Sequence, residues 1–282
     1  MICHGTEREH NKKIGLALSG GAARGLSHIG VLQVLQQEGI PIDIIAGTSA
    51  GAVMGAVYAS GQDTSKMIEH ALDAGWKRMA PLIDPSFPKT GFLKGKKITR
   101  LLSTYIGGNI RFSDLKIPFA CVATDIDTGE EIVINSGLVL EALRASISIP
   151  GIFTVVKREG RHLVDGGLTT PVPVNVVKRM GADFIIAVNV NPAVTARMGK
   201  SSKVRIEARK EPNIFQIIMQ SIYITTYSIA QHSLEGADIV IEPDLAHIGP
   251  GDFHKAGELI DQGQQAARKA IPEIKRKLGE LK

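Results

Sequence analysis

The amino-acid sequence predicts an α/β fold in which helices cover both faces of a mostly parallel central sheet. Two observations favour this class. Apolar runs of strand length alternate with longer segments of helical character along the chain, and the apolar runs are continuous instead of alternating with polar residues. Continuous apolar runs are typical of strands buried on both faces, and the alternating order is typical of strands joined by crossover helices. We therefore expect a three-layer α/β/α architecture within a single domain, residues 14–282.

The expected strands are short runs rich in branched apolar side chains. They cover residues 14–19, 42–46, 118–126, 131–135, 184–190 and 238–242. The segments between them have helical character and cover residues 26–39, 49–61, 138–147, 173–181 and 213–236. A terminal amphipathic helix is expected within residues 253–282, where apolar or small residues recur at helical spacing: Phe253, Ala256, Leu259, Ile260, Gly263 and Ala267.

Two segments interrupt this pattern. Residues 1–13 are polar and lack the apolar stretch of a secretory signal, so we expect a disordered tail there. Residues 79–95 hold three prolines, which disfavour a helix or a central strand. This second segment is expected to be either a lid-like excursion or a loop that packs its apolar side chains into a satellite core.

Cysteine content and the distribution of charge indicate the compartment and the kinds of partner that this protein would have. Cys3 and Cys121 form no disulfide framework, which favours a reducing compartment. Residues 44–61 are uncharged but short and rich in glycine, which argues against a membrane span. Residues 195–210 carry six basic side chains and one glutamate, and form either a solvated loop or a contact for phosphate headgroups. We expect a cytoplasmic protein, with peripheral membrane contact as an option and no nucleic-acid partner.

Ser49 lies in a G-x-S-x-G pentapeptide whose glycines are Gly47 and Gly51. An expected strand precedes this pentapeptide and an expected helix follows it. Glycine at these two positions permits a sharp turn that exposes the serine hydroxyl at the carboxyl edge of the sheet. The helix dipole would favour a developing alkoxide at Ser49. The pattern therefore indicates a nucleophile, although a small residue in a glycine-rich packing seam fits the same letters.

A second glycine-rich loop follows the first expected strand and reads GGAARG from Gly20 to Gly25. Its main-chain amides, with a helix N-terminus behind them, predict an anion site. A dinucleotide site would need a G-x-G-x-x-G loop here and an acidic residue at the end of the next strand. Ala22 replaces one glycine of that loop pattern, and Gly47 lies where the acidic residue is needed. The amides of Gly20 to Ala22 are better suited to hold the oxyanion of an acyl-transfer reaction. Arg24 is expected to support the loop or to form an ordinary salt bridge.

Asp165 ends a short expected strand and is followed by Gly166 and Gly167. Its carboxylate is a candidate base for Ser49 if burial raises its pKa, and a plain D-G-G turn is the alternative. A Ser-Asp-His triad of the α/β-hydrolase type would use His247 or His254 as the third member. His28, on the helix after the glycine loop, is expected to be a packing residue.

With these three features in one chain, the sequence resembles the patatin-like phospholipases, in particular their compact single-domain bacterial members. The resemblance covers most of residues 14–275 and includes the segment ASISIPGIF at 145–153. It implies an α/β/α fold, a Ser49–Asp165 dyad without a catalytic histidine, and hydrolysis of acyl esters in lipids. It further implies an oxyanion loop at Gly20, Gly21, Ala22, Arg24 and Gly25. The family usually has glycine where Ala22 stands, and an alanine is accommodated there if its φ is negative.

The expected function is that of a serine lipid acyl hydrolase, of phospholipase A or lysophospholipase type. No cofactor and no metal ion is implied, because no His, Cys or acidic cluster has ligand spacing. Two alternatives stay open at this point: a non-catalytic adaptor with the same fold that binds acyl groups, and the α/β-hydrolase triad. The expected partner is a lipid or another acyl ester.

Overall fold

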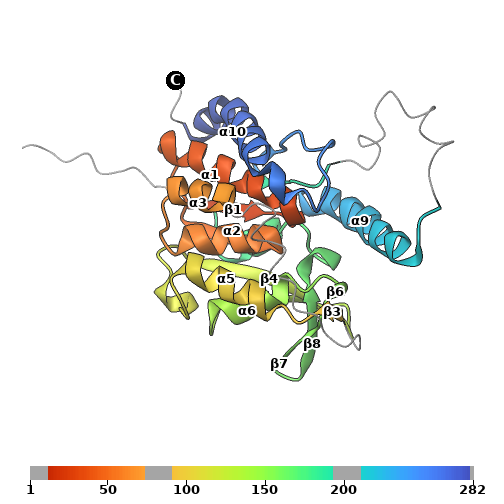
Figure 1. Cartoon of the computed structure of the whole chain (residues 1–282). Coiled ribbons are helices and arrows are strands. Elements are labelled where there is room, and N and C mark those ends of the chain that lie inside the picture. The colour runs from red at the N-terminus through yellow and green to blue at the C-terminus, as the bar shows by residue number, and fades with distance from the viewer. Residues whose placement is uncertain (1–11, 74–90, 193–210, 280–282) are drawn as a thin grey trace, which may run out of the picture.

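The computed structural model describes residues 12–73, 91–192 and 211–279. Residues 1–11 of the expected tail, residues 79–90 of the expected excursion and the whole basic segment 195–210 lie outside the described residues. Three layers are visible in Figure 1, with a central sheet between two sets of helices, which confirms the predicted fold class.

Eight strands form the central sheet in the described part of the chain, in the order β10-β9-β1-β2-β4-β8-β7 with β5 also paired to β4. Their bounds are β1 Ile14–Leu18, β2 Ile44–Thr48, β4 Phe119–Asp125, β5 Glu131–Ile134, β7 Val156–Arg158, β8 Arg161–Asp165, β9 Phe184–Val188 and β10 Ile239–Ile241. The five strands from β10 to β4 are parallel, while β5, β8 and β7 run antiparallel to their neighbours. A separate small sheet pairs β3 (Gly91–Leu93) with β6 (Gly151–Phe153).

Six helices of the described residues correspond to the predicted helical segments, with ends trimmed by a few residues. They are α1 Ser27–Gln37, α2 Ala50–Ala59, α6 Val139–Ser146, α7 Val174–Arg179, α9 Ile214–Ser233 and α10 Ala256–Leu278. Two more, α3 Thr64–Asp73 and α5 Lys96–Ile106, were not predicted. Short 3-10 turns stand at η1 Ala22–Leu26, η3 Phe112–Asp114, η4 Gly166–Leu168 and η6 Phe253–Lys255.

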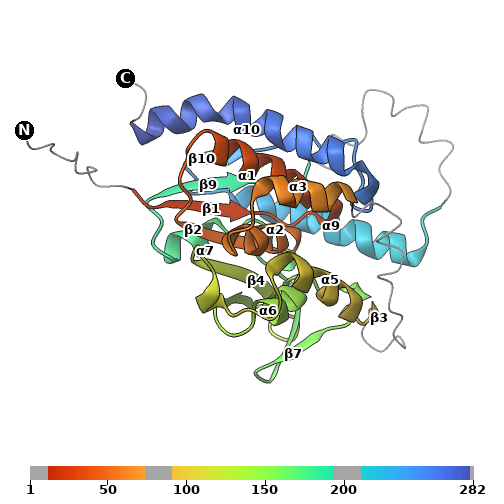
Figure 2. The ribbon, with the colours of Figure 1, turned by 60° about the vertical axis from the view of Figure 1, so that its left-hand side comes forward.

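The alternating sides of the central strands divide the core in two. Leu16, Leu18 and Ile45 face the larger cluster, which α1, α2, α3, α5, α6 and α10 complete. Ala17 and Ala46 face the smaller cluster, which α7 and one residue of α9 complete. In the view of Figure 2, α10 and α1 lie above the sheet strands and α5 and α6 lie below α2. Burial on both faces explains why the parallel strands read as continuous apolar runs.

Because β1, β2 and β9 run parallel, their carboxyl ends meet at one edge of the sheet. The glycine loop and the Ser49 turn follow β1 and β2 at this edge. Within the described residues, no helix combines the length and the apolarity that a bilayer crossing requires. Residues 44–61 are divided between strand β2 and helix α2, in agreement with the sequence interpretation.

Candidate active site

Ser49 occupies the single residue between β2 and α2. Its backbone has φ 53° and ψ −120°, a conformation that is strained for a residue with a Cβ atom. The turn is sharp because its flanking glycines touch other main chain: a Cβ on Gly51 would lie 2.3 Å from the Leu18 carbonyl oxygen, and one on Gly47 would lie 2.5 Å from the Gly51 carbonyl oxygen. The strand-turn-helix predicted around the pentapeptide is therefore present.

Hydrogen bonds fix both the backbone and the side chain of Ser49. The Ser49 hydroxyl donates to Asp165 Oδ2 at 2.5 Å. The Ser49 amide donates to the Ser146 hydroxyl at 2.9 Å, and that hydroxyl donates to the Val122 carbonyl at 2.6 Å. Ser49 is 6% exposed and Asp165 is 7% exposed, so both groups are withdrawn from bulk water. Residues 116 positions apart in the sequence thus form a direct pair.

Asp165 is held at the end of β8 with its carboxylate between two donors. Oδ1 accepts from the Gly167 amide at 2.8 Å, while Oδ2 accepts from Ser49. Gly166 lies against β4, where a Cβ would meet the Val122 carbonyl oxygen at 2.4 Å. Burial raises the pKa of Asp165 to about 6, and the bonds from Ser49 and Gly167 act in the opposite direction. The carboxyl group is therefore a stronger base than an exposed aspartate.

The glycine loop lies against Ser49, since a Cβ on Gly20 would be 3.3 Å from the Ser49 Cβ. The Gly20 amide donates to the Pro171 carbonyl and the Ala23 amide donates to the Pro250 carbonyl. Gly20 is thus not a free donor, contrary to the sequence expectation. Among the described residues, no acceptor takes the amides of Gly21 and Ala22. These two amides remain as the candidate oxyanion donors.

Ala22 does not meet the condition of a negative φ, because its φ is 51°. The two neighbouring amide bonds, from Gly20 and Ala23, hold the loop in this left-handed conformation. Arg24 is buried and its Nε donates to the Ile248 carbonyl. Of the two roles considered for it, support of the loop and an ordinary salt bridge, this contact favours support of the loop. Gly25 abuts Ala50 at the start of α2.

The histidines of the triad alternative form other contacts. His247 is half exposed and pairs with Glu258 at 2.7 Å. His254 lies in η6, before α10. The carboxylate of Asp165 accepts from Ser49 and Gly167, and no histidine of the described chain hydrogen-bonds to it. His28 is buried beside the Ser19 carbonyl, and burial lowers its pKa to about 4, as suits a packing residue.

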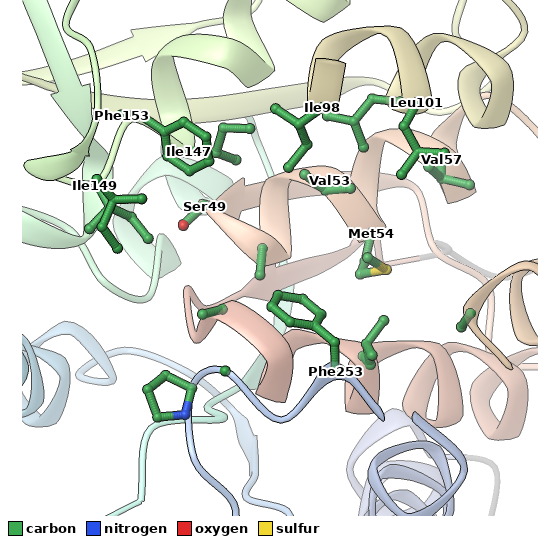
Figure 3. Close-up of a pocket in the computed structure, with 18 of the residues that line it drawn as sticks. Ser49, Val53, Met54, Val57, Ile98, Leu101, Ile147, Ile149, Phe153 and Phe253 are labelled. Carbon is green, nitrogen blue, oxygen red and sulfur yellow. The ribbon is translucent and has the colours of Figure 1, made fainter. Parts of the chain in front are cut away.

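A cavity of about 560 Å³ opens beside Ser49 and is lined almost entirely by apolar side chains. Figure 3 shows Ser49 on the wall of the cavity, with Ile149 and Phe153 to one side of it and Val53, Met54 and Val57 along α2 to the other. At 1.5 Å per residue, Val57 lies about 12 Å along the helix axis from Ser49. Other walls of the cavity come from Ile98 and Leu101 of α5 and from Phe253. The segment that follows α6 contributes Ile147, Ile149 and Phe153. The volume is that of a small-molecule site.

Sequence reasoning missed several of these residues. Ser146 and Ile147 belong to the segment 145–153, which was noted only for the family resemblance. Helix α5 was hidden by the low apolar content of its exposed face, although Ile98, Leu101 and Leu102 recur at helical spacing and could have revealed it.

Across the described residues, no three metal-ligating side chains gather at one place.

Comparison with known proteins identifies a family and a shared fold. The family profile described as Patatin-like phospholipase matches residues 16–178. A Mycobacterium tuberculosis protein named as an uncharacterised NTE family protein is 29% identical over 330 residues, covering 92% of this chain and 91% of that protein. Lysophospholipase NTE1 of Pyricularia oryzae is 35% identical over 186 residues, which cover 64% of this chain but 12% of that much longer protein. The crystal structure of VipD from Legionella pneumophila matches with a TM-score of 0.59 at 15% identity, covering 92% of this chain and 67% of that one, which shows a shared fold.

Proposed function

The chain belongs to the patatin-like phospholipase family, and from this membership we propose that it is a lipid acyl hydrolase whose nucleophile is Ser49 and whose base is Asp165. The observation that carries the proposal is the 2.5 Å bond between the Ser49 hydroxyl and the Asp165 carboxylate, with Ser49 on the wall of an apolar cavity. A chain that only binds acyl groups would not need this buried pair, so we favour the hydrolase over the adaptor.

In the first step the Ser49 oxygen attacks the ester carbonyl carbon while its proton passes to Asp165. The carbonyl electron pair moves onto the oxygen, which the amides of Gly21 and Ala22 would stabilise by about 3 kcal/mol each. Collapse of this intermediate breaks the bond to the alcohol, which leaves with the proton from Asp165. An acyl group then remains on Ser49.

In the second step Asp165 takes a proton from water as the water oxygen attacks the acyl carbon. The bond to Ser49 breaks, Ser49 recovers its proton from Asp165, and a fatty acid is released. A carboxyl pKa of about 6 suits both proton transfers, because the group is ionised at neutral pH yet is far more basic than a reference aspartate.

The apolar lining of the cavity favours burial of the acyl portion of the substrate. A chain that enters from Ser49 would run along α2 past Val53 toward Val57, while the alcohol portion stays beside Ser49. We propose a cytoplasmic enzyme with peripheral access to membrane lipids, formed by a single domain over residues 14–282.

Hydrolysis of p-nitrophenyl acyl esters tests the proposal. Ser49→Ala and Asp165→Asn are each expected to lower kcat/KM by about a thousandfold or more. His247→Ala and His254→Ala, which change exposed histidines, serve as matched controls and should retain wild-type kcat/KM. A folded histidine variant without activity would instead support the Ser-Asp-His triad.

A further inference from the structure

Helix α9 differs from the other helices in how little of it is buried. Ala230 is its one buried residue, and the first two turns project beyond the body of the molecule, as Figures 1 and 2 both show. Nine large apolar side chains are exposed among the described residues, and five of them lie on this helix: Ile214, Phe215, Ile217, Ile218 and Ile224. Such a concentration marks an interaction surface instead of an ordinary water-facing helix.

The two sides of α9 have different neighbours. Phe215, Met219 and Tyr223, four residues apart, line the same cavity as Ser49. Ile214, Ile217 and Ile218 lie on the other side of the first two turns and are 73%, 47% and 48% exposed. One helix therefore carries the wall of the cavity on one side and an apolar outer face on the other. We call Ile214, Ile217, Ile218 and Ile224 the outer face of α9.

The charges near the start of α9 are exposed Glu211, three residues before Ile214, and the basic residues that flank Phe92. Residues 214–233 contain no Asp, Glu, Lys or Arg. The ring of Phe92 in β3, itself 55% exposed, packs edge-on against Phe215 with centroids 6.4 Å apart, and so brings β3 against the first turn of α9. Residues 91–113 contain five basic residues and no acidic one, and Lys94 and Arg100 among them are exposed.

We propose that the outer face of α9, together with Phe92, inserts into the interface of an anionic lipid bilayer. An apolar helix face lies in the plane of the headgroups, and neighbouring Lys and Arg side chains add attraction to anionic lipids. A second copy of the chain is a poorer occupant, because two such surfaces would bring like charges together. The inference rests on the proposed function in one respect: the same helix would then guide an acyl chain from the bilayer into the cavity.

Vesicle flotation tests this surface without any turnover. The full chain carrying Ser49→Ala is mixed with vesicles of phosphatidylcholine alone or of phosphatidylcholine with phosphatidylglycerol. We expect binding to the anionic vesicles, weaker binding to the neutral ones, and a decrease with added salt. The further double change Ile217→Gln with Ile218→Gln should weaken binding to anionic vesicles by about tenfold or more.

The matched control is Ile126→Gln with Val240→Gln, which removes two apolar side chains of similar exposure, 48% and 41%, from other elements. This control should bind as the parent does. Circular dichroism checks the folding of each variant. If the Ile217 and Ile218 variant unfolds, vesicle binding is measured with Ile214→Gln and Ile224→Gln combined instead.

Equal binding by a folded outer-face variant and its parent would overturn the proposal. A parent that ignores both vesicle types would also overturn it. So would light scattering that shows a dimer which the outer-face variant dissociates, because the surface would then join two copies. Since every measurement uses the Ser49→Ala chain, a failure here is separate from a failure of the proposed dyad.

Discussion

The turn after β2 and the loop after β1 each hold a non-glycine residue in the left-handed region, Ser49 at φ 53° and Ala22 at φ 51°. The turn is fixed by bonds from Ser49 itself, to Ser146 through its amide and to Asp165 through its hydroxyl. The loop is fixed from its flanks, by the amides of Gly20 and Ala23, while the amide of Ala22 has no acceptor among the described residues. The Ser49 turn is therefore held through the residue that would react. The glycine loop is held by its flanking residues, so that the amides of Gly21 and Ala22 stay available.

The largest expected effect concerns the ionisation of Asp165 in the turn. Its pKa of about 6 means that the carboxyl group is neutral below that pH and ionised above it. Because the proposed base must be ionised, kcat/KM should fall about tenfold for each pH unit below about 6. A pH series of p-nitrophenyl ester hydrolysis measures this. A rate that stays flat down to pH 4 would remove Asp165 from the role of base.

Asp165→Asn is expected to make the folded chain more stable at neutral pH. The folded pKa of about 6 exceeds the reference 3.8, so folding disfavours the ionised form, and 2.2 pH units at 1.36 kcal/mol each give a cost of about 3 kcal/mol. This cost is absent below the unfolded pKa and grows as pH rises from about 4 to about 6. Urea unfolding at neutral and acidic pH measures it, and the variant's advantage should be present at pH 7 and shrink at pH 4.5. A less stable variant at pH 7 would contradict this account of the buried carboxylate.

Ser146→Ala is expected to lower kcat about tenfold and to change KM little. The substitution leaves the Ser49 amide without its acceptor and loosens the strained turn that aims the hydroxyl. Steady-state kinetics on a soluble ester separates the two constants. A rise in KM alone would instead place Ser146 in substrate binding.

The smallest effect is expected in the glycine loop. Ala22→Gly relieves the left-handed strain but adds freedom to the unfolded chain, so the free energy of unfolding should change by about 1 kcal/mol or less. Ala23→Gly, at a buried neighbour with ordinary backbone angles, is the control and should destabilise the fold by about 1 kcal/mol. Thermal unfolding of both variants checks this, and a larger loss at Ala22 than at Ala23 would contradict it.

The sequence was sufficient for the fold class because the parallel strands are buried on both faces and read as continuous apolar runs. It also singled out Ser49 and Asp165 as candidates, since glycines that allow main chains to touch stand beside both, and the two side chains form a hydrogen bond in the structure. The φ of Ala22 could not be predicted, because it depends on the carbonyls of Pro171 and Pro250, which lie about 150 and 230 residues away.

The role of Ser146 was equally hidden, because its hydroxyl acts on a turn 97 positions earlier in the chain and no local pattern marks it. The apolar cavity escaped prediction for a similar reason. Its walls come from helices α1, α2, α3, α5 and α9, the segment after α6 and the residues before α10, which only the packed fold brings together.

Reaction with a fluorophosphonate tests the central claim most directly, because only an activated serine attacks such a probe. Mass spectrometry of the labelled wild-type chain should find one adduct, on Ser49, and none in the Ser49→Ala chain, with much slower labelling of Asp165→Asn. Ester hydrolysis that persists without an adduct on Ser49, or with an adduct on another residue, would contradict the Ser49–Asp165 dyad.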